Sequence, residues 1–334
     1  MRRPKTIIIA EAGVNHNGSV DLAKKMIETA FEAGADFIKF QTFESENLVT
    51  ENTKLARYQK VSSGEIDQLT MLKKLELSEE DFIEIHRHCT SIGIKFLSTP
   101  FDVNSLEILD KFDMDFIKIA SGELTNYPFL VEICKRKKPI ICSTGMSTIE
   151  EIKDALSVFF VNGIDKEIIT ILQCNTQYPT PYSDVNLNAM IEMKSRFDTR
   201  VGFSDHTLGI EASLAAVAMG ASIIEKHFTI DNNLPGPDHK ASLNPYHLNN
   251  LISSIRNIEK SFGNDKKMPT ESEKENLHLA RKSIVAKIDI QEGEIFTEQN
   301  LTTKRPGTGL SPMKWTDIIG HRAKCNFRKD DFIK

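Results

Sequence analysis

Two histidines stand at the ends of apolar runs, in surroundings that favour a metal site. His206 follows "VGFSD", and His227 lies in "EKHFTI", 21 residues further along the chain. A single histidine in such a place could equally be a hydrogen-bonded core residue. Each of these two has a polar residue two positions before it, Ser204 and Glu225, and in a strand such residues share a face. No cysteine is close in sequence, so the pair indicates a site of nitrogen and oxygen ligands for Mn²⁺, Co²⁺, Fe²⁺ or Zn²⁺.

Lys118 is a lysine at the end of an apolar run, and it admits two catalytic roles. Its amine could bind the charge of a phosphate or a carboxylate, or it could form a Schiff base with a carbonyl substrate. Hydroxyl and amide side chains at the ends of other runs favour the anion cradle, since a Schiff base alone would not need them. These residues are Thr99, Ser121, Ser143, Asn175 and Ser204. Taken singly, each hydroxyl residue could instead cap the following helix.

Two carboxylates have positions from which they could donate or accept a proton or bind a hydroxyl group. Glu11 ends the first apolar run of the chain, and Glu123 follows Lys118 in "ASGELTNYP". Either could act as a general acid or base. Glu123 could also be a helix-entry residue that the helix dipole favours.

All these residues lie at the ends of short apolar runs that alternate with amphipathic stretches. The runs predict strands at 6–13, 37–43, 94–99, 115–121, 139–144, 168–175, 200–206 and 221–229. Stretches such as 19–33 and 79–92 predict the helices between them. Eight strand–helix units in about 260 residues match an α/β protein of the (β/α)8 barrel type better than an open sheet. Because every strand turns polar at its C-terminal end, we expect an active site at the barrel mouth.

The rest of the chain divides into an insertion, a linker and a small C-terminal domain. Residues 44–77 form a long insertion after the second strand, which we expect to cover the mouth as a lid. The barrel should span 1–265, and the charged stretch 266–282 reads as a linker with a helical part. Residues 283–334 contain short apolar runs between glycine turns and predict a mostly β domain.

Composition excludes several classes of protein. The net charge of -5 gives no electrostatic case for binding nucleic acid or an anionic membrane. The apolar start of the chain is too short for a secretory signal, and no stretch approaches the ~18 apolar residues of a membrane span. The five cysteines form no CxxC pair. Four of them lie inside apolar or helical stretches, which indicates buried free thiols and a reduced, cytoplasmic compartment.

Short motifs along nearly the whole chain resemble those of the sialic acid synthase family. They are "AEAGVNHNG" (10–18), "KFQTF" (39–43), "STPFD" (98–102), "KIASGE" (118–123), "STGM" (143–146), "CNTQYPTP" (174–181), "GFSDHT" (202–207), "EKHFT" (225–229), "GPDHKAS" (236–242) and "KRPGTGLSP" (304–312). The resemblance implies a (β/α)8 barrel followed by an antifreeze-like (SAF) domain. It also implies a homodimer in which this domain reaches over the active site of the other subunit. The implied reaction condenses phosphoenolpyruvate with an N-acetylated mannose-type sugar and releases phosphate.

The resemblance also implies a role for each candidate residue. His206 and His227 would hold a divalent metal, most often Mn²⁺, with Mg²⁺ or Co²⁺ as alternatives. Glu11 would lie close to the metal and a water molecule, and Glu123 would contact the reacting end of the sugar. The phosphoenolpyruvate would contact Lys118, Thr99, Ser121, Ser143, Asn175 and Ser204. The sugar would contact Gln41, Tyr178 and Asp238, and its N-acetyl group would contact Arg305 of the partner subunit.

Several alternatives stay open at this point. Within the family the sugar could be N-acetylmannosamine, giving N-acetylneuraminate, or 2,4-diacetamido-2,4,6-trideoxymannose, giving N,N'-diacetyllegionaminate. A Schiff-base aldolase using Lys118 would explain the barrel but would leave the histidine pair unused. A non-catalytic glycan- or ice-binding protein is a third possibility, although Thr297, Thr302 and Thr303 lack the regular spacing of an ice-binding array.

Overall fold

The computed structural model describes residues 4–56, 59–60 and 64–334. The chain forms two compact units, Met1–Gly263 and Asn264–Lys334. The division falls two residues before the predicted end of the barrel at residue 265. It assigns the predicted linker to the second unit.

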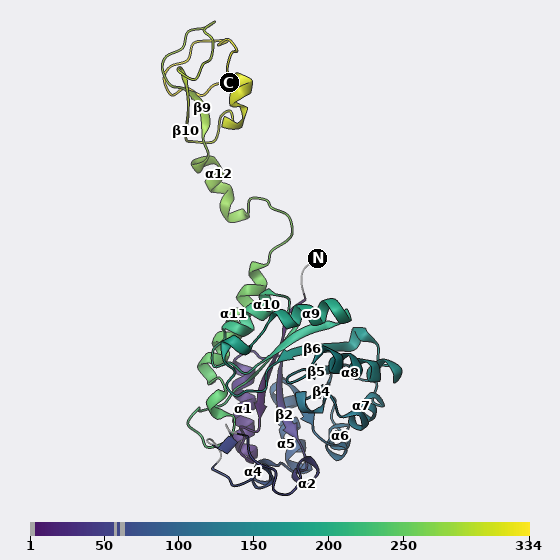
Figure 1. Cartoon of the computed structure of the whole chain (residues 1–334). Coiled ribbons are helices and arrows are strands. Elements are labelled where there is room, and N and C mark those ends of the chain that lie inside the picture. Colours follow the sequence, from purple (N-terminus) through teal and green to yellow (C-terminus); the bar gives the residue numbers. More distant parts are fainter. Residues whose placement is uncertain (1–3, 57–58, 61–63) are drawn as a thin grey trace. The chain divides into compact units, whose positions relative to one another are not determined.

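Eight parallel strands form the centre of the first unit (Figure 1). They are β1 (Ile7–Gly13), β2 (Phe37–Thr42), β3 (Lys95–Pro100), β4 (Ile117–Ile119), β5 (Ile140–Ser143), β6 (Ile169–Cys174), β7 (Arg200–Asp205) and β8 (Ile223–His227). Their hydrogen-bonded order is β3-β2-β1-β8-β7-β6-β5-β4, and the end strands β3 and β4 lie next to each other. This arrangement confirms the predicted (β/α)8 barrel.

The helices between the strands surround this sheet (Figure 1). They are α1 (Val20–Glu32), α5 (Glu79–Ile92), α6 (Val103–Leu109), α7 (Tyr127–Cys134), α8 (Ile149–Val161), α9 (Asn188–Phe197), α10 (Glu211–Ala218) and α11 (Pro245–Ser261). Helix α5 begins with a capping box, in which the side chains of Ser78 and Asp81 each accept the other's backbone N–H. It ends at Gly93, whose φ of 92° is the left-handed conformation that favours glycine.

The core of the barrel unit fills the layer between strands and helices. Phe40, Phe82, Phe159 and Phe228 are among its largest fully buried side chains. Truncating such a residue to alanine typically costs about 3–5 kcal/mol. The outer faces of the strands therefore anchor the fold, which leaves their polar C-terminal ends available for chemistry.

The insertion after β2 carries two short helices, α2 (Ser45–Leu48) and α4 (Gln68–Leu75). Met71, Leu72 and Leu75 of α4 belong to a separate buried apolar cluster with Val14 and residues of the insertion. The insertion is therefore held at the end of the barrel by apolar packing, as a lid requires. Residues 57–58 and 61–63 of the predicted lid lie outside the described residues.

The second unit has an apolar core of its own. It contains α12 (Lys274–Ala280), the antiparallel strands β9 (Ser283–Ala286) and β10 (Leu301–Lys304), and the short helix α13 (Trp315–Ile318). Buried residues such as Ile284, Phe296 and Leu301 fill its core. A small, mostly β domain was predicted here. None of the helices in the described part of the chain is long and apolar enough to cross a membrane.

Candidate active site

A cavity of about 560 Å³ opens at the C-terminal ends of the strands. The predicted site residues that line it come from all eight strands or the loops after them. They are Glu11, Gln41, Thr99, Lys118, Ser121, Ser143, Tyr178, Ser204, His206, His227 and Asp238. The structure thus brings most of the sequence-predicted residues to one cavity.

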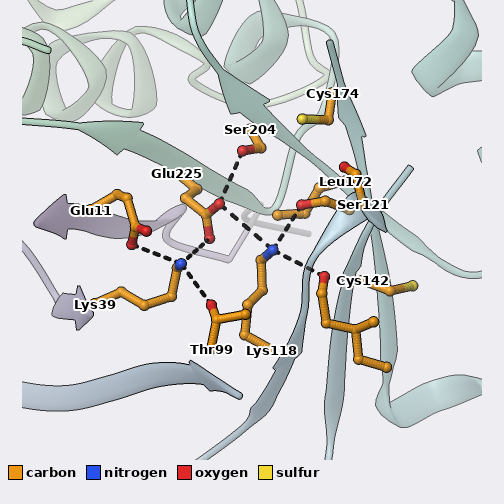
Figure 2. Close-up of polar contacts among 12 residues, drawn as sticks. Glu11, Lys39, Thr99, Lys118, Ser121, Cys142, Leu172, Cys174, Ser204 and Glu225 are labelled. Carbon is orange, nitrogen blue, oxygen red and sulfur yellow. Dashed lines mark hydrogen bonds and ion pairs between the residues drawn. The ribbon is translucent and has the colours of Figure 1, made fainter. Parts of the chain in front are cut away.

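Two buried lysines share one carboxylate at the floor of this cavity (Figure 2). The Nζ of Lys39 lies 3.7 Å from one carboxylate oxygen of Glu225, and the Nζ of Lys118 lies 3.6 Å from the other. Lys39 also contacts Glu11 at 2.7 Å, and Ser204 donates a hydrogen bond of 2.9 Å to Glu225. Strand register places Glu11 beside Lys39 and Ser204 beside Glu225.

Each lysine also donates to a hydroxyl group that the sequence predicted at the mouth. Lys39 donates to Thr99 Oγ1 at 2.9 Å, and Lys118 donates to Ser143 Oγ at 2.8 Å. Ser121 Oγ accepts the backbone N–H of Gly145 at 2.9 Å. Capping of the following helices therefore does not explain these hydroxyl groups. The two lysines with Thr99 and Ser143 are called the lysine cradle below.

Burial shifts the pKa values of the ionisable groups at this floor. Burial lowers the pKa of Lys118, whereas the attraction of Glu11 and Glu225 outweighs burial at Lys39 and raises its pKa. Burial raises the pKa of Glu11 to about 7, against the opposing effect of Lys39. A carboxyl group with that pKa can exchange a proton near neutral pH.

The two histidines face one another beside the cradle. Their ring centroids are 5.3 Å apart, and the ring of Tyr178 lies 4.1 Å from His206 and 5.6 Å from His227. His206 Nδ1 donates to the carbonyl oxygen of Asn175 at 2.5 Å, so in the neutral ring the lone pair lies on Nε2. Burial and the nearby charges hold the pKa of His227 well below its usual range, so this ring is neutral.

The histidine pair fits a divalent metal. Among the described residues, His227 Nδ1 is a buried atom without a hydrogen-bond partner, and a buried nitrogen of this kind needs a ligand. No group of three or more His, Cys, Asp or Glu in residues 4–56, 59–60 and 64–334 is arranged to hold a metal. A metal held by these two nitrogens would leave coordination positions to substrate and water.

Polar side chains line the cavity beside the two histidines. Asp238 lines the cavity, and burial raises its pKa to about 6. Gln41 Nε2 donates to Glu11 at 3.3 Å and so connects this wall to the lysine cradle. These side chains can bind the hydroxyl and amide groups of a sugar.

Three predicted residues do not line the cavity. Glu123 lies on a 3-10 turn, Ser121–Glu123, and accepts a hydrogen bond from Asn126. The amide of Asn175 closes a local turn, with its Oδ1 accepting from Gln177 N, and its backbone carbonyl orients His206. Arg305 belongs to the second unit, where its Nε donates to Ala280 O. Their proposed substrate contacts stay predictions.

The sequence reasoning assigned no role to Lys39 and Glu225. Each lies two positions before a predicted site residue and shares its strand face. Lys39 precedes Gln41, and Glu225 precedes His227. The alternation of side chains predicts both as mouth residues, without a role for either. Their joint role depends on contacts between charged side chains of different strands.

Comparison with known proteins identifies the family. The NeuB family matches residues 26–267, and the SAF domain matches residues 281–334. The chain belongs to the NeuB family. It is 50% identical, over 99% of both chains, to the N,N'-diacetyllegionaminic acid synthase of Campylobacter jejuni subsp. jejuni serotype O:2. It is 43% identical to the synthase of the same name from Legionella pneumophila, over 96% of this chain and 90% of that one.

A solved structure supports the same assignment. The N-acetylneuraminic acid synthetase of Leptospira borgpetersenii serovar Hardjo-bovis, crystallised with citrate, is 35% identical and superimposes with a TM-score of 0.72. The match covers 82% of this chain and 90% of that chain. The predicted fold class, with a barrel and an SAF domain, is confirmed, as is the predicted class of sugar acid synthase.

Proposed function

We propose that this NeuB-family enzyme condenses phosphoenolpyruvate with 2,4-diacetamido-2,4,6-trideoxymannose to give N,N'-diacetyllegionaminate and phosphate. The observation that carries the proposal is the pair of buried lysines beside a facing histidine pair in one cavity. The lysines suit the two anionic groups of phosphoenolpyruvate, and the histidines suit a metal that activates a carbonyl compound.

The lysine cradle would divide the charges of phosphoenolpyruvate between its two sides. Lys39 with Thr99 forms one donor pair, and Lys118 with Ser143 forms the other. The carboxylate of phosphoenolpyruvate would bind one pair, and its phosphate would bind the other. Each anionic group would replace part of the attraction that Glu225 now exerts on the lysines. Because these donors are fixed before the substrate enters, they stabilise charge without reorganisation.

His206 and His227 would hold the metal, most often Mn²⁺, with Mg²⁺ or Co²⁺ as alternatives. When bound, the metal supplies Lewis-acid polarisation of the open-chain aldehyde of the sugar. His206 is already oriented for this by the Asn175 carbonyl, and His227 is neutral and can offer a lone pair. Asp238 and Gln41 would bind the polar groups of the sugar.

The reaction joins C3 of phosphoenolpyruvate to C1 of the sugar and leaves positive charge at C2. Water then adds at C2, and the tetrahedral intermediate loses phosphate by breaking its C–O bond. Glu11 would accept the proton of that water, which its pKa of about 7 and its position in the cavity lining support. Lys118 and Ser143 stabilise the departing phosphate.

The insertion supports the choice of a 6-deoxy sugar with two acetamido groups. Met71, Leu72 and Leu75 of α4 add an apolar wall to the cavity, and Gln68 adds an amide beside it. A methyl group at C6 gains from apolar contact, while a hydroxyl group there would lose its hydrogen bonds to water. N-acetylmannosamine carries hydroxyl groups at both C4 and C6, so we expect it to be the poorer substrate.

Phosphate release tests this function. Enzyme with Mn²⁺ and phosphoenolpyruvate should release phosphate with 2,4-diacetamido-2,4,6-trideoxymannose at a kcat/KM at least about 10-fold above that with N-acetylmannosamine. Mass analysis of the product identifies the nine-carbon acid. A preference for N-acetylmannosamine would refute the sugar assignment, and release with neither sugar would refute the reaction.

One observation favours a Schiff-base aldolase as a second candidate. Burial lowers the pKa of Lys118, which brings its amine closer to the neutral form that attacks a carbonyl. Borohydride added with substrate would then trap a covalent adduct on Lys118, and chelators would have no effect. We expect no adduct, since Glu225 and Ser143 hold this amine as an ammonium group.

We also propose a cytoplasmic homodimer. The five cysteines are free, which suits a reducing compartment. The second unit carries Arg305 in a compact domain separate from the barrel. The SAF domain of one subunit would bring Arg305 of the partner subunit to the N-acetyl group of the sugar. Sedimentation analysis and an Arg305→Ala variant test this arrangement.

A further inference from the structure

A fully buried ion pair lies directly behind the two histidines. The Nζ of Lys226 is 2.9 Å from Asp205 Oδ2, and the two side chains are 2% and 0% exposed. Asp205 and Lys226 are paired in the register of β7 and β8. Each immediately precedes a proposed metal ligand, His206 and His227 respectively. Because side chains alternate along a strand, the ion pair takes the outer face and the histidines take the cavity face.

The ion pair holds the backbone of Thr207, the residue after His206. Asp205 Oδ1 accepts the N–H of Thr207 at 2.8 Å, and Lys226 donates to the carbonyl oxygen of Thr207 at 2.7 Å. The chain around His206 is thus tied to a residue of β8 that adjoins His227. One ammonium group therefore connects the peptide segments that carry both imidazoles.

A second contact of Asp205 leads away from the histidines. Its Oδ2 accepts a hydrogen bond of 2.6 Å from Ser213, which lies on α10. Asp205 therefore contacts α10 through Ser213, and it separately contacts the segments that carry His206 and His227. A variant can remove the contact with α10 and leave the other contacts in place.

Stability alone does not explain a pair of this kind. Burying two charges costs desolvation that their attraction roughly repays, and well-packed apolar residues often stabilise such a site equally well. The geometry points to a different role. We propose that Asp205 and Lys226 are positioning residues that hold His206 and His227 at the separation a divalent metal requires. This inference rests on the proposed metal site.

Mn²⁺ binding to the full-length enzyme, followed by the electron paramagnetic resonance signal of free Mn²⁺, tests the proposal. The main variant is Asp205→Asn with Lys226→Met. It removes both charges together, so neither charge is left buried without its partner. Asp205→Asn alone is a second variant that keeps an acceptor for Thr207 but leaves Lys226 without its counter-charge. Ser213→Ala is the matched control, because it removes only the tie to α10. Circular dichroism confirms folding at the temperature of the titration.

The double variant should bind Mn²⁺ about 10- to 100-fold more weakly than the wild type, as expected when groups that orient metal ligands are lost. Ser213→Ala should bind Mn²⁺ as the wild type does. In turnover, the double variant should lose kcat at low Mn²⁺ while the KM for phosphoenolpyruvate changes little, since the lysine cradle faces the cavity.

Two results would overturn the proposal in distinguishable ways. Wild-type Mn²⁺ affinity in the folded double variant would show that the ion pair does not position the histidines. Equal Mn²⁺ binding by wild type and His206→Ala would instead remove the metal site itself, and the positioning role would fall with it.

Discussion

Glu225 is the residue whose removal should test the charge balance of the lysine cradle. Its carboxylate lies 3.7 Å from Lys39 and 3.6 Å from Lys118. At an effective dielectric constant of 20, each of these contacts corresponds to about 4–5 kcal/mol of attraction. Glu225→Gln keeps the shape and the acceptor for Ser204 but removes this attraction. The two ammonium groups would then share only Glu11.

We expect Glu225→Gln to lower the free energy of unfolding of the substrate-free enzyme by about 3–5 kcal/mol, the usual cost of stranding a buried charge. Phosphoenolpyruvate, which supplies negative charge to the same lysines, should restore much of that loss. The variant should therefore be stabilised more strongly by phosphoenolpyruvate than the wild type is, by an extra shift of roughly 5–10 °C in the unfolding midpoint.

Thermal unfolding with and without phosphoenolpyruvate measures both effects. Asp36→Asn is the matched control, because Asp36 pairs with Arg256 and Lys5 among residues outside the cavity. That variant should lose stability without any added response to phosphoenolpyruvate. A Glu225→Gln enzyme as stable as the wild type, or one with a smaller response to phosphoenolpyruvate, would refute the shared-carboxylate interpretation.

Three further predictions concern other parts of the chain. A Cβ at Gly145 would lie 2.9 Å from Ser121 Oγ, so Gly145→Ala should raise the KM for phosphoenolpyruvate about 10-fold, and an unchanged KM would argue against Ser121 in the cradle. Burial lowers the pKa of His16 to about 4 from 6.5, so between these values the unfolded chain binds more protons and stability falls as the pH falls. From pH 7 to 5 the loss from this group is about 2 kcal/mol, and His16→Asn, which can still accept the N–H of Gly18, should show a correspondingly shallower pH dependence in urea unfolding. Arg305→Ala should raise the KM for the sugar far more than that for phosphoenolpyruvate, and equal effects would contradict the contact with the N-acetyl group.

The sequence predicted the barrel well because its signals are local. Apolar runs of strand length and cap residues such as Ser19 and Ser78 lie within a few residues of the boundaries they set. The polar ends of the strands identified the mouth for the same reason. His206 and His227 share a cavity because parallel strands bring their C-terminal ends to one side.

The parts that sequence reasoning missed depend on contacts between strands. Lys39 and Glu225 looked like ordinary mouth residues, and only the side-chain contacts in the structure show that Glu225 faces two lysines. Glu123 has a local partner, Asn126, on the 3-10 turn after β4, and its predicted contact with the sugar stays a prediction. Asn175 contributes its carbonyl to His206, a backbone role that no side-chain pattern predicts.

The fate of the bridging oxygen of phosphoenolpyruvate tests the central chemistry most directly. Substrate labelled with ¹⁸O between C2 and phosphorus should be turned over with the acceptor sugar and Mn²⁺, and the released phosphate analysed by mass spectrometry. Water addition at C2 and loss of phosphate by C–O cleavage predict that the phosphate carries the label. Unlabelled phosphate would mean that the P–O bond breaks, which would contradict the condensation that the lysine cradle and the histidine pair are proposed to perform.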